Sequence, residues 1–493
     1  AAIPGRLINM ETNQQNTAPL PYFSANDGLW ATDGTWARPE VWDPPHTGPI
    51  EWNIVRTSND IQSGQREIKV LGLISEEKTL EMEGSNPDGW VGGGDGNPLY
   101  ITHYLKLNGI IDLQGESQLL QPMGSIVDGT STGSLQRDQQ GTANSFNYNY
   151  WSSPVSPTAS GSSYTVGEVL KDGSDPANPG PIDFGDPYGY ADGTYTGAKK
   201  ISNYWISIFR NSAADEYGQW KFQYGSNGSI NVGEGFTMKG TSGAVALETA
   251  QNYTFEGLPN NGTISLETNI DKNYLIGNPY PSVIDSWEFI DDNLAVRRDG
   301  KNYFDGALYF WDHFGKKDSH ILLDYVGGYA ALTKLGGVHA MSNDNRIDST
   351  GTKNDELPGR YIPVGQAFFV NSTTGAGYTI SSGDIKFNNS QRIFREEGDD
   401  SQFLKPEEHV KSQKVSKIEK IRISYKSPLG YNRQILVGAH PSATNGFDLG
   451  YDAPLFDYNK EDMYWIQESN WLVIQGVSNF DKEQVLPLGI VLD

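Results

Sequence analysis

Ile68-Lys-Val-Leu-Gly72-Leu-Ile74 and Leu105-Lys-Leu-Asn-Gly109-Ile-Ile111 are two similar strings that lie 37 residues apart. In both, apolar residues alternate with other residues and a glycine marks a bend, which is typical of short β-strands that turn corners. The alternation continues from Leu113 to Leu119. The pattern predicts either a short β-solenoid or an ordinary meander, because a repeat architecture normally shows three or more similar units.

The composition extends this prediction to the rest of the chain. Its 493 residues include 56 Gly, 26 Tyr, 19 Phe and 12 Trp. Aromatic residues fit the half-buried surfaces of sheets, and Gly, Asn, Asp and Pro supply turns. We therefore expect an all-β protein built from tandem β-sandwich domains, jelly-roll or immunoglobulin-like, with very few helices. One helix is predicted, because Ser282 and Asp285 resemble a capping box before an apolar stripe that ends near Asn293.

Changes in composition along the chain predict five segments. They are an extended, irregular N-terminal segment (1–50), the meander or short solenoid (51–145), a large β-sandwich (146–395), a charged linker (396–416) and an immunoglobulin-like sandwich (417–493). The last segment has five recognisable strands, where such a sandwich has about seven. We therefore expect it to be incomplete, so that either the natural protein continues past Asp493 or a partner completes the sheet. The chain begins with Ala-Ala, without an initiator Met or a signal peptide, so we expect a processed product or a fragment.

The charge and the cysteine count exclude several classes of function. The net charge of −24 argues against a nucleic-acid binder and against docking on an anionic membrane through a basic patch. Cysteine is absent, which excludes disulfide scaffolds, cysteine-ligated zinc and thiol catalysis. No apolar run approaches the length of about 18 residues that spans a bilayer. We expect no nucleic-acid partner and no direct membrane insertion.

The motifs of common enzymes are missing. The sequence contains no P-loop, and its seven His never show the His-Glu-x-x-His spacing. His313 and His320 are interpreted as packed or hydrogen-bonded imidazoles. Gly129-Thr-Ser131-Thr-Gly133 has the letters of a nucleophile elbow, but polar turns flank it where the motif needs a strand and a helix, so we predict a loop. No catalytic residue is predicted.

Two acidic clusters are candidates for calcium, because Ca²⁺ prefers oxygen ligands on irregular loops. Neither has the spacing of an EF-hand, and a solvated acidic loop or a series of Asx turns is the more common explanation of such clusters. Their residues are Asp172, Asp175, Asp183 and Asp186 in the first cluster and Asp448 and Asp452 in the second. Beyond this possible Ca²⁺, no cofactor is required.

Exposed aromatic rings stack on sugar rings, although most Trp and Tyr side chains of a β-protein pack in its core or at its rim. The candidates for carbohydrate contact are Tyr188, Tyr190, Trp311 and Tyr325. Asp348-Ser349-Thr350 resembles the acceptor for O-glycosylation in Bacteroidota, which makes Ser349 the candidate acceptor.

Several separated strings resemble, taken together, large secreted and cell-surface proteins of Flavobacteria and related Bacteroidota that are exported through the type IX secretion system. The strings are Asp138-Gln-Gln-Gly141, Asn147-Tyr-Asn-Tyr-Trp-Ser-Ser-Pro154, Gly235-Phe-Thr-Met-Lys-Gly240, Tyr274-Leu-Ile-Gly-Asn-Pro-Tyr-Pro-Ser282, Tyr361-Ile-Pro-Val-Gly-Gln-Ala-Phe-Phe-Val370, Phe387-Asn-Asn-Ser-Gln-Arg392 and Gly446-Phe-Asp-Leu-Gly-Tyr-Asp452. The resemblance implies an extracellular or outer-surface location and a chain that continues into a sorting domain. It implies no catalytic residues.

These observations favour a structural or adhesive surface protein. In this hypothesis the protein is a subunit of an extracellular filament or sheath that binds copies of itself, or other surface proteins, by pairing β-strand edges. The alternative is a glycan-binding accessory protein of polysaccharide capture. A polysaccharide hydrolase, which needs two carboxylates flanking the scissile bond, is the third hypothesis.

Overall fold

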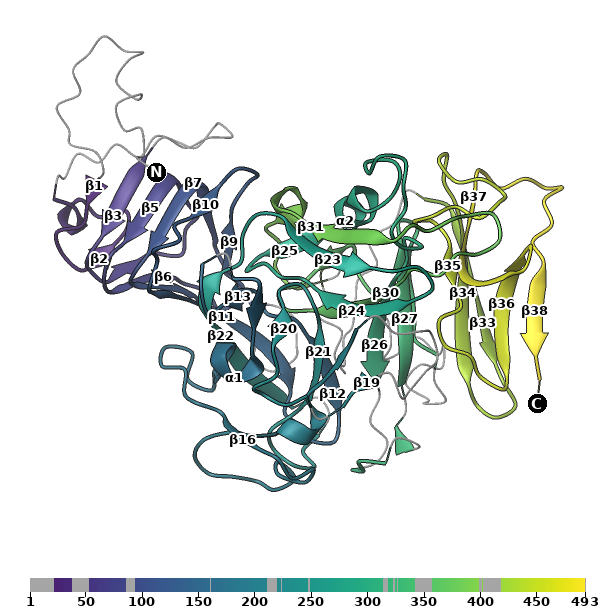
Figure 1. The fold of residues 1–493 in the computed structure, drawn as a ribbon, viewed down its shortest axis with the longest axis horizontal. Coiled ribbons are helices and arrows are strands. Elements are labelled where there is room, and N and C mark those ends of the chain that lie inside the picture. The colour runs from purple at the N-terminus through teal and green to yellow at the C-terminus, as the bar shows by residue number, and fades with distance from the viewer. Residues whose placement is uncertain are drawn as a thin grey trace, which may run out of the picture.

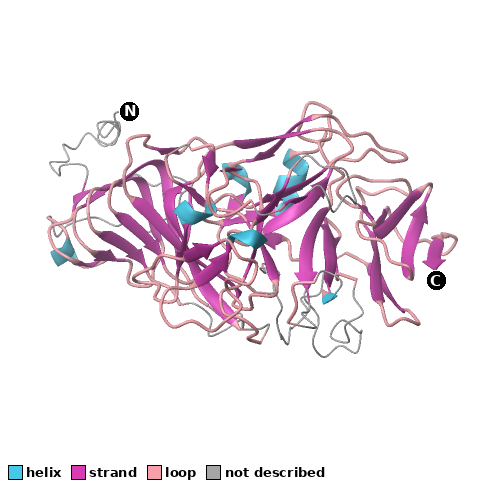
Figure 2. Cartoon of the chain, turned by 60° about the horizontal axis from the view of Figure 1, so that its bottom comes forward, coloured by secondary structure: helices cyan, strands magenta, loops and turns pink. Residues whose placement is uncertain are grey.

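The computed structural model describes residues 22–37, 53–85, 94–159, 161–210, 220–222, 224–246, 249–313, 318–321, 324–325, 327–341, 357–398, 401 and 418–492. Strands make up 45% of the structure and helices 5%, which confirms the predicted all-β class (Figures 1 and 2). Most of the predicted N-terminal segment and of the charged linker lies outside the described residues, as does Ser349.

The N-terminal strands alternate between two sheets whose neighbouring strands run parallel, as in a solenoid and unlike a meander. The first sheet contains β1 (Tyr22–Phe23), β3 (Ile54–Thr57), β5 (Ile68–Ser75), β7 (Pro98–Leu107), β9 (Gln118–Leu120) and β10 (Ile126–Val127). The parallel strands of the second are β2 (Gly28–Leu29), β4 (Ile61–Gln62), β6 (Thr79–Met82), β8 (Ile110–Leu113) and β11 (Ser134–Thr142). Figure 1 shows these strands stacked at the purple end of the molecule.

Aliphatic side chains at paired positions form two columns inside the solenoid. One column consists of Val55, Leu73, Leu105 and Val127, and the other of Ile61, Leu80, Ile111 and Leu135. All eight side chains are buried. Because apolar burial stabilises by about 25 cal/mol per Å², these columns help to hold successive coils together, beside the backbone hydrogen bonds of the two sheets.

The two strings that predict the repeat are not equivalent in the structure. Leu73 pairs with Leu105, and Ile68 pairs with Leu99. Gly72 lies within β5, at a shift in the strand register, whereas Gly109 lies at the corner between β7 and β8. The 37-residue offset therefore differs from the structural register, because the corners between strands vary in length.

The middle of the chain extends the second solenoid sheet and adds smaller sheets. β22 (Ala250–Pro259) pairs antiparallel with β11, β13 (Val155–Ser156) and β15 (Leu170–Asp172). A four-stranded sheet consists of β12 (Tyr148–Trp151), β21 (Phe236–Lys239), β18 (Ser207–Phe209) and β19 (Trp220–Lys221). Two-stranded sheets are formed by β14 (Ser163–Tyr164) with β20 (Ile230–Asn231), by β16 (Asp183–Gly185) with β17 (Lys200–Ser202), and by β23 (Ile264–Thr268) with β31 (Gly383–Phe387). A three-stranded sheet consists of β29 (Tyr361–Ile362), β25 (Val283–Asp285) and β32 (Arg392–Ile393).

The described residues contain two short α-helices, α1 (Val166–Val169) and α2 (Ser286–Asp292). The helix predicted near Ser282 is α2, but it begins later than the capping-box pattern indicates. Asp285 is the N-cap, and its carboxylate accepts a hydrogen bond from the Trp287 amide at 3.0 Å. Ser282 is buried before β25, where its hydroxyl accepts a hydrogen bond from Arg392.

A five-stranded sheet forms the centre of the C-terminal half, and we call it the middle sheet. Its order is β24 (Asn273–Gly277), β30 (Ala367–Asn371), β26 (Leu308–His313), β27 (Gly327–Thr333) and β28 (Gly336–Val338). One of its faces packs on a core that contains Phe289 of α2, Phe310 and Phe368.

The last strands form one mixed sheet, which we call the terminal sheet. Its order is β33 (Lys420–Lys426), β34 (Asn432–Ala439), β37 (Asn470–Val477), β36 (Asp462–Gln467) and β38 (Leu488–Val491), and β35 (Ala453–Pro454) also pairs with β37. β34 and β37 are parallel, which differs from the antiparallel sheets of the predicted immunoglobulin-like sandwich. A core with Tyr309, Phe369, Leu436 and Val473 lies between the terminal and middle sheets. The terminal sheet therefore packs on the middle sheet.

Asp305 lies in this C-terminal half with no exposed surface, and it makes stability depend on pH. Its carboxylate accepts hydrogen bonds from the Ala307 amide at 2.9 Å and the Tyr309 hydroxyl at 3.2 Å. Burial raises its pKa to about 7. A carboxyl whose native pKa is raised stabilises the fold below its unfolded pKa of about 4. That stability is lost as the pH rises through 7.

We predict that Asp305→Asn removes this loss, because the amide fills the same space without ionising. Each unit of pKa shift corresponds to about 1.4 kcal/mol of stability. From pH 4 to pH 8 the wild type should therefore lose on the order of 4 kcal/mol of its free energy of unfolding relative to the variant. Urea unfolding at both pH values measures this difference. Equal pH dependence of the two proteins would contradict the prediction.

Candidate functional site

Lys239, the last residue of β21, is buried in a group of aromatic rings. Its Nζ lies 3.6 Å from the centroid of the Trp205 ring, 4.7 Å from that of Tyr148 and 5.0 Å from that of Tyr325. We call this group the Lys239 cluster. Its members are Phe146, Tyr148, Tyr188, Asp192, Tyr204, Trp205, Lys239, His320 and Tyr325.

Segments far apart in the chain position this cluster. Tyr148 of β12 is the direct cross-strand partner of Lys239. Trp205 ends a single 3₁₀ turn, Asn203–Trp205, which follows β17. Asp192 comes from the loop between β16 and β17, and His320 from the stretch 318–321. The sheet pairing thus fixes one wall of the cluster, and the loops bring the other groups to it.

A continuous chain of polar groups runs through the cluster. The Lys239 amine donates to Nδ1 of His320 at 2.9 Å, and Nε2 of His320 lies 3.0 Å from the Asp192 carboxylate. The carboxylate requires a donor, so the imidazole carries its proton on Nε2 and accepts at Nδ1. The His320 ring stacks on Trp205 with a centroid distance of 4.7 Å.

Burial changes the pKa values of two groups in this hydrogen-bonded series. Burial lowers the pKa of Lys239 to about 6, although Asp192 acts in the opposite direction. Burial and the Lys239 charge also lower the pKa of His320, again against Asp192. The faces of three aromatic rings favour the ammonium form of Lys239. Because the amine is enclosed, we assign Lys239 a positioning role: it joins β21 to the loops that carry Asp192 and His320.

Tyr188 is the exposed member of the cluster, with 60% of its surface accessible. Its ring makes T-shaped contacts with His320 and Tyr204, at centroid distances of 5.8 and 6.2 Å. Its carbonyl accepts a hydrogen bond from the Trp205 indole at 2.7 Å. The backbone and ring of Tyr188 are therefore held in place while the ring remains accessible to a ligand.

Polar and aromatic groups continue along residues 183–205, which comprise β16, β17, the loop between them and the 3₁₀ turn, and which we call the Tyr188 loop. The Tyr190 hydroxyl donates to Asp183 at 2.8 Å, and the Lys200 amine lies over the rings of Tyr190 and Tyr195. Asp186 accepts a hydrogen bond from the Asn203 side chain. Asp183 and Asp186 thus order the Tyr188 loop.

The other predicted calcium ligands also bond within the chain. Asp172 accepts from the backbone and hydroxyl of Ser174, and Asp175 from the Asn178 side chain. Asp448 accepts from Thr444, and the fully buried Asp452 carboxylate accepts from the Asp448 and Gly476 amides. No group of three or more acidic or His side chains in the described part of the chain is arranged to hold a metal ion. Calcium binding stays a prediction.

The four predicted aromatic residues do not form one surface. Tyr188 and Tyr325 belong to the Lys239 cluster, and Tyr190 lies in the same loop as Tyr188. Trp311 lies apart, stacked on Tyr150 at 5.8 Å beside the core between the two C-terminal sheets. Sequence reasoning missed Lys239 and Trp205, because a lone Lys at the end of a strand and a Trp in a β-rich chain carry no distinctive spacing.

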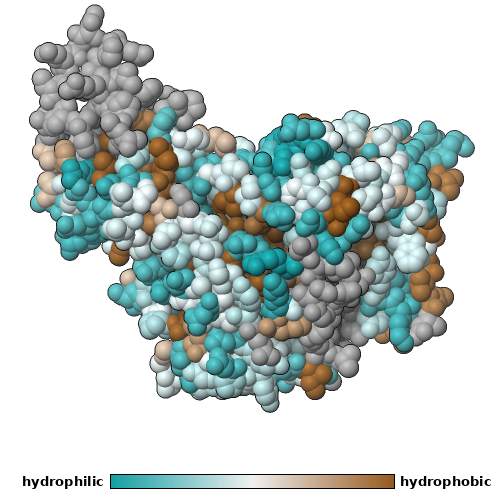
Figure 3. Space-filling view, viewed as in Figure 1, coloured by the Kyte–Doolittle hydropathy of each residue, from teal (hydrophilic) through white to brown (hydrophobic). Residues whose placement is uncertain are grey.

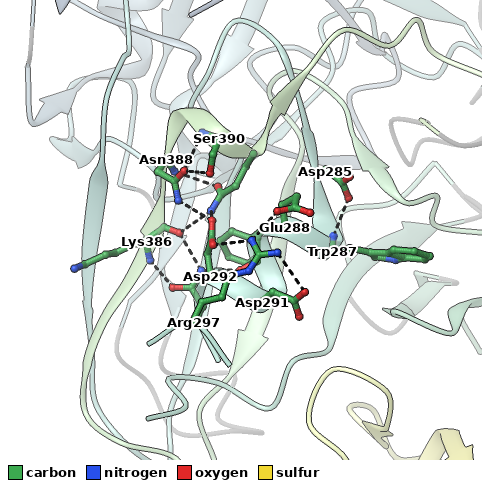
Figure 4. Close-up of polar contacts among 12 residues, drawn as sticks. Asp285, Trp287, Glu288, Asp291, Asp292, Arg297, Lys386, Asn388 and Ser390 are labelled. Carbon is green, nitrogen blue, oxygen red and sulfur yellow. Dashed lines mark hydrogen bonds and ion pairs between the residues drawn. The ribbon is translucent and has the colours of Figure 1, made fainter. Parts of the chain in front are cut away.

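A dense set of charges at α2 has a structural explanation. Arg297 lies 2.6 Å from Glu288, 3.0 Å from Asp292 and 3.7 Å from Asp291 (Figure 4). Asp292 also accepts a hydrogen bond from the Asn388 side chain at 2.7 Å. These contacts join α2 to the segment after β31, and each of the carboxylates has a partner. We assign this network to stability.

Comparison with known proteins gives one match. Residues 194–493 match a family described as a domain of unknown function (DUF8693). No curated protein and no solved structure matches the chain. The matched region includes the middle sheet, the terminal sheet and most of the Lys239 cluster. Because the match covers more than half of its length, the chain belongs to the DUF8693 family.

Proposed function

We propose that the protein is an extracellular adhesive protein and that its Tyr188 loop binds carbohydrate. The resemblance to secreted and surface proteins of Bacteroidota supports the extracellular location. No helix among the described residues is long and apolar enough to cross a membrane. The proposed role joins the predicted adhesive function to glycan binding.

The exposed, fixed ring of Tyr188 carries this proposal. An exposed ring held in place by neighbouring rings loses little conformational entropy when a sugar ring stacks on it. The carboxylate of Asp183, the Tyr190 hydroxyl and the Lys200 amine lie in the same loop and supply acceptors and donors for sugar hydroxyls. A mostly apolar contact with a few fixed polar groups is the usual composition of a small-molecule site.

Pairing of strand edges stays a prediction. The terminal sheet packs on the middle sheet, and this packing leaves the question of its edges open to experiment. β38, which pairs with β36 alone among the described strands, supplies an edge for such assembly. Figure 3 shows apolar residues along this side of the molecule, at the right of the view.

An array of soluble plant and algal polysaccharides tests the proposed function. We expect the wild type to bind at least one polysaccharide and Tyr188→Ala to weaken that binding about tenfold, the loss that follows truncation of an anchoring side chain. Tyr431→Ala, in the hairpin between β33 and β34, is the matched control and should bind normally. Release of reducing sugars from the bound polysaccharide would contradict a purely adhesive role, and unchanged binding by Tyr188→Ala would exclude the Tyr188 loop.

A further inference from the structure

A second pair of exposed aromatic rings lies on the terminal sheet. Trp471 is 42% exposed and Tyr458 is 57% exposed. Their centroids are 6.0 Å apart, and the ring planes meet at 63°. The two rings therefore form an open corner, far along the sequence from the Lys239 cluster. We propose that this corner binds a neutral sugar unit of a polysaccharide.

Trp471 is fixed by the terminal sheet. It is the second residue of β37, where it pairs with Ile466 of β36, and its carbonyl accepts a hydrogen bond from the Leu455 amide at 2.8 Å. The indole stacks on the buried ring of Tyr464 with a centroid distance of 4.5 Å and an angle of 16°. One face of the indole is thus occupied, and β36 and the residue that follows β35 hold the backbone of Trp471.

Tyr458 is fixed by its neighbours in the loop between β35 and β36. The Asp457 carboxylate accepts hydrogen bonds from Arg433 at 3.1 Å and from the Tyr329 amide at 3.2 Å. The Asn459 amide donates to Asp462 at 3.3 Å. Because the residues on both sides of Tyr458 are anchored, its exposed ring has a set position relative to Trp471.

An exposed aromatic residue whose ring is not held in place needs no functional explanation, because much of a protein surface is apolar. Two exposed rings that contact each other, and that are held by hydrogen bonds at or next to their own residues, favour a binding role. Their side chains lose little conformational entropy when a ligand binds. Tyr and Trp supply large contact area with few rotatable bonds, which is why they recur at recognition surfaces.

The geometry and the charge select the ligand. A pyranose ring has an apolar face of C–H groups that stacks on an indole, and the 63° angle lets the second ring contact the edge of the same sugar. The exposed Glu468 lies in the hairpin that leads to Trp471. Together with the net charge of −24, it disfavours anionic polysaccharides. Neutral hexopyranose polymers are the ligands that this corner fits.

Affinity electrophoresis of the full chain tests this inference, with galactomannan and xyloglucan as neutral probes and alginate as the anionic probe. We expect retardation by a neutral polymer and none by alginate. Trp471→Ala and Tyr458→Ala should each weaken binding about tenfold. Tyr431→Ala should bind as the wild type does. Tyr458 lies in a loop, so its variant decides the question if Trp471→Ala does not fold.

This inference shares only its ligand class with the proposed function, and the variants separate the two. If Tyr458→Ala and folded Trp471→Ala keep full binding while Tyr188→Ala loses it, the corner is not a site and the Tyr188 loop stands. The reverse pattern supports the corner and overturns the Tyr188 loop. A wild type that neither neutral polymer retards, or that alginate retards equally, overturns the inference.

Discussion

Replacing Arg433 with Met is expected to lower the free energy of unfolding by about 3–5 kcal/mol, the usual cost of removing one partner from a buried ion pair. Arg433 of β34 is 1% exposed. Its guanidinium contacts both carboxylate oxygens of Asp462, at 2.8 and 3.0 Å, and also Asp457 at 3.1 Å. Met has similar volume but leaves the buried Asp462 charge without its partner. Urea unfolding followed by circular dichroism measures the loss.

Arg56→Met is the matched control. Arg56 also pairs with a carboxylate, that of Glu76, but its side chain is 38% exposed. A surface pair contributes about 0–1 kcal/mol, so this variant should unfold close to wild type. If the two substitutions lower the free energy of unfolding equally, the buried Arg433 network stabilises the fold no more than a surface ion pair does. Arg433→Met should also weaken polysaccharide binding at the corner of Trp471 and Tyr458, because Asp457 anchors Tyr458.

Gly133→Ala is expected to destabilise the solenoid by about 3 kcal/mol, the upper part of the usual range for overpacking. A Cβ at position 133 would lie 2.0 Å from the Gly109 carbonyl oxygen, in the corner of the preceding coil. The Gly133 amide donates to the Leu107 carbonyl at 2.9 Å, so the backbone cannot move away without losing that bond. Thermal unfolding of the variant tests the expectation.

Gly129→Ala provides a control from the same stretch. A Cβ at position 129 meets nothing within 4 Å, so the substitution should be neutral or slightly stabilising. A Gly133→Ala variant as stable as Gly129→Ala would mean that the coils separate easily at this corner. The comparison also tests the loop predicted for Gly129–Gly133, in which the Ser131 hydroxyl accepts a hydrogen bond from the Leu107 amide and serves as a structural group.

Local patterns predicted local structure well. The alternation of apolar residues indicated short strands in the N-terminal part of the chain, and the apolar stripe that ends near Asn293 identified α2. These features depend on neighbours in sequence. The closure of the solenoid was not predictable in this way, because Val55, Leu73 and Leu105 are brought together by corners of different length.

The candidate sites also depend on contacts between residues that are far apart in sequence, which local patterns do not predict. Tyr188 was one of four aromatic candidates for carbohydrate contact, but the contact that supports its ring comes from His320, more than a hundred residues away in sequence. Asp452 looked like a metal ligand because acidic residues surround it in sequence. In the fold its carboxylate is enclosed and caps the Gly476 amide, and burial raises its pKa well above the usual value. Burial and long-range contacts of this kind are not encoded by any spacing rule.

The unequal corners of the solenoid have a consequence for how such a protein diversifies. Its aliphatic columns require only that each new coil return to the same register, and the entropy of closing a loop rises slowly with loop length. Insertions and deletions at the corners are therefore tolerated while the columns persist. Related chains can acquire or discard outward loops, and with them new specificities, without rebuilding the interior.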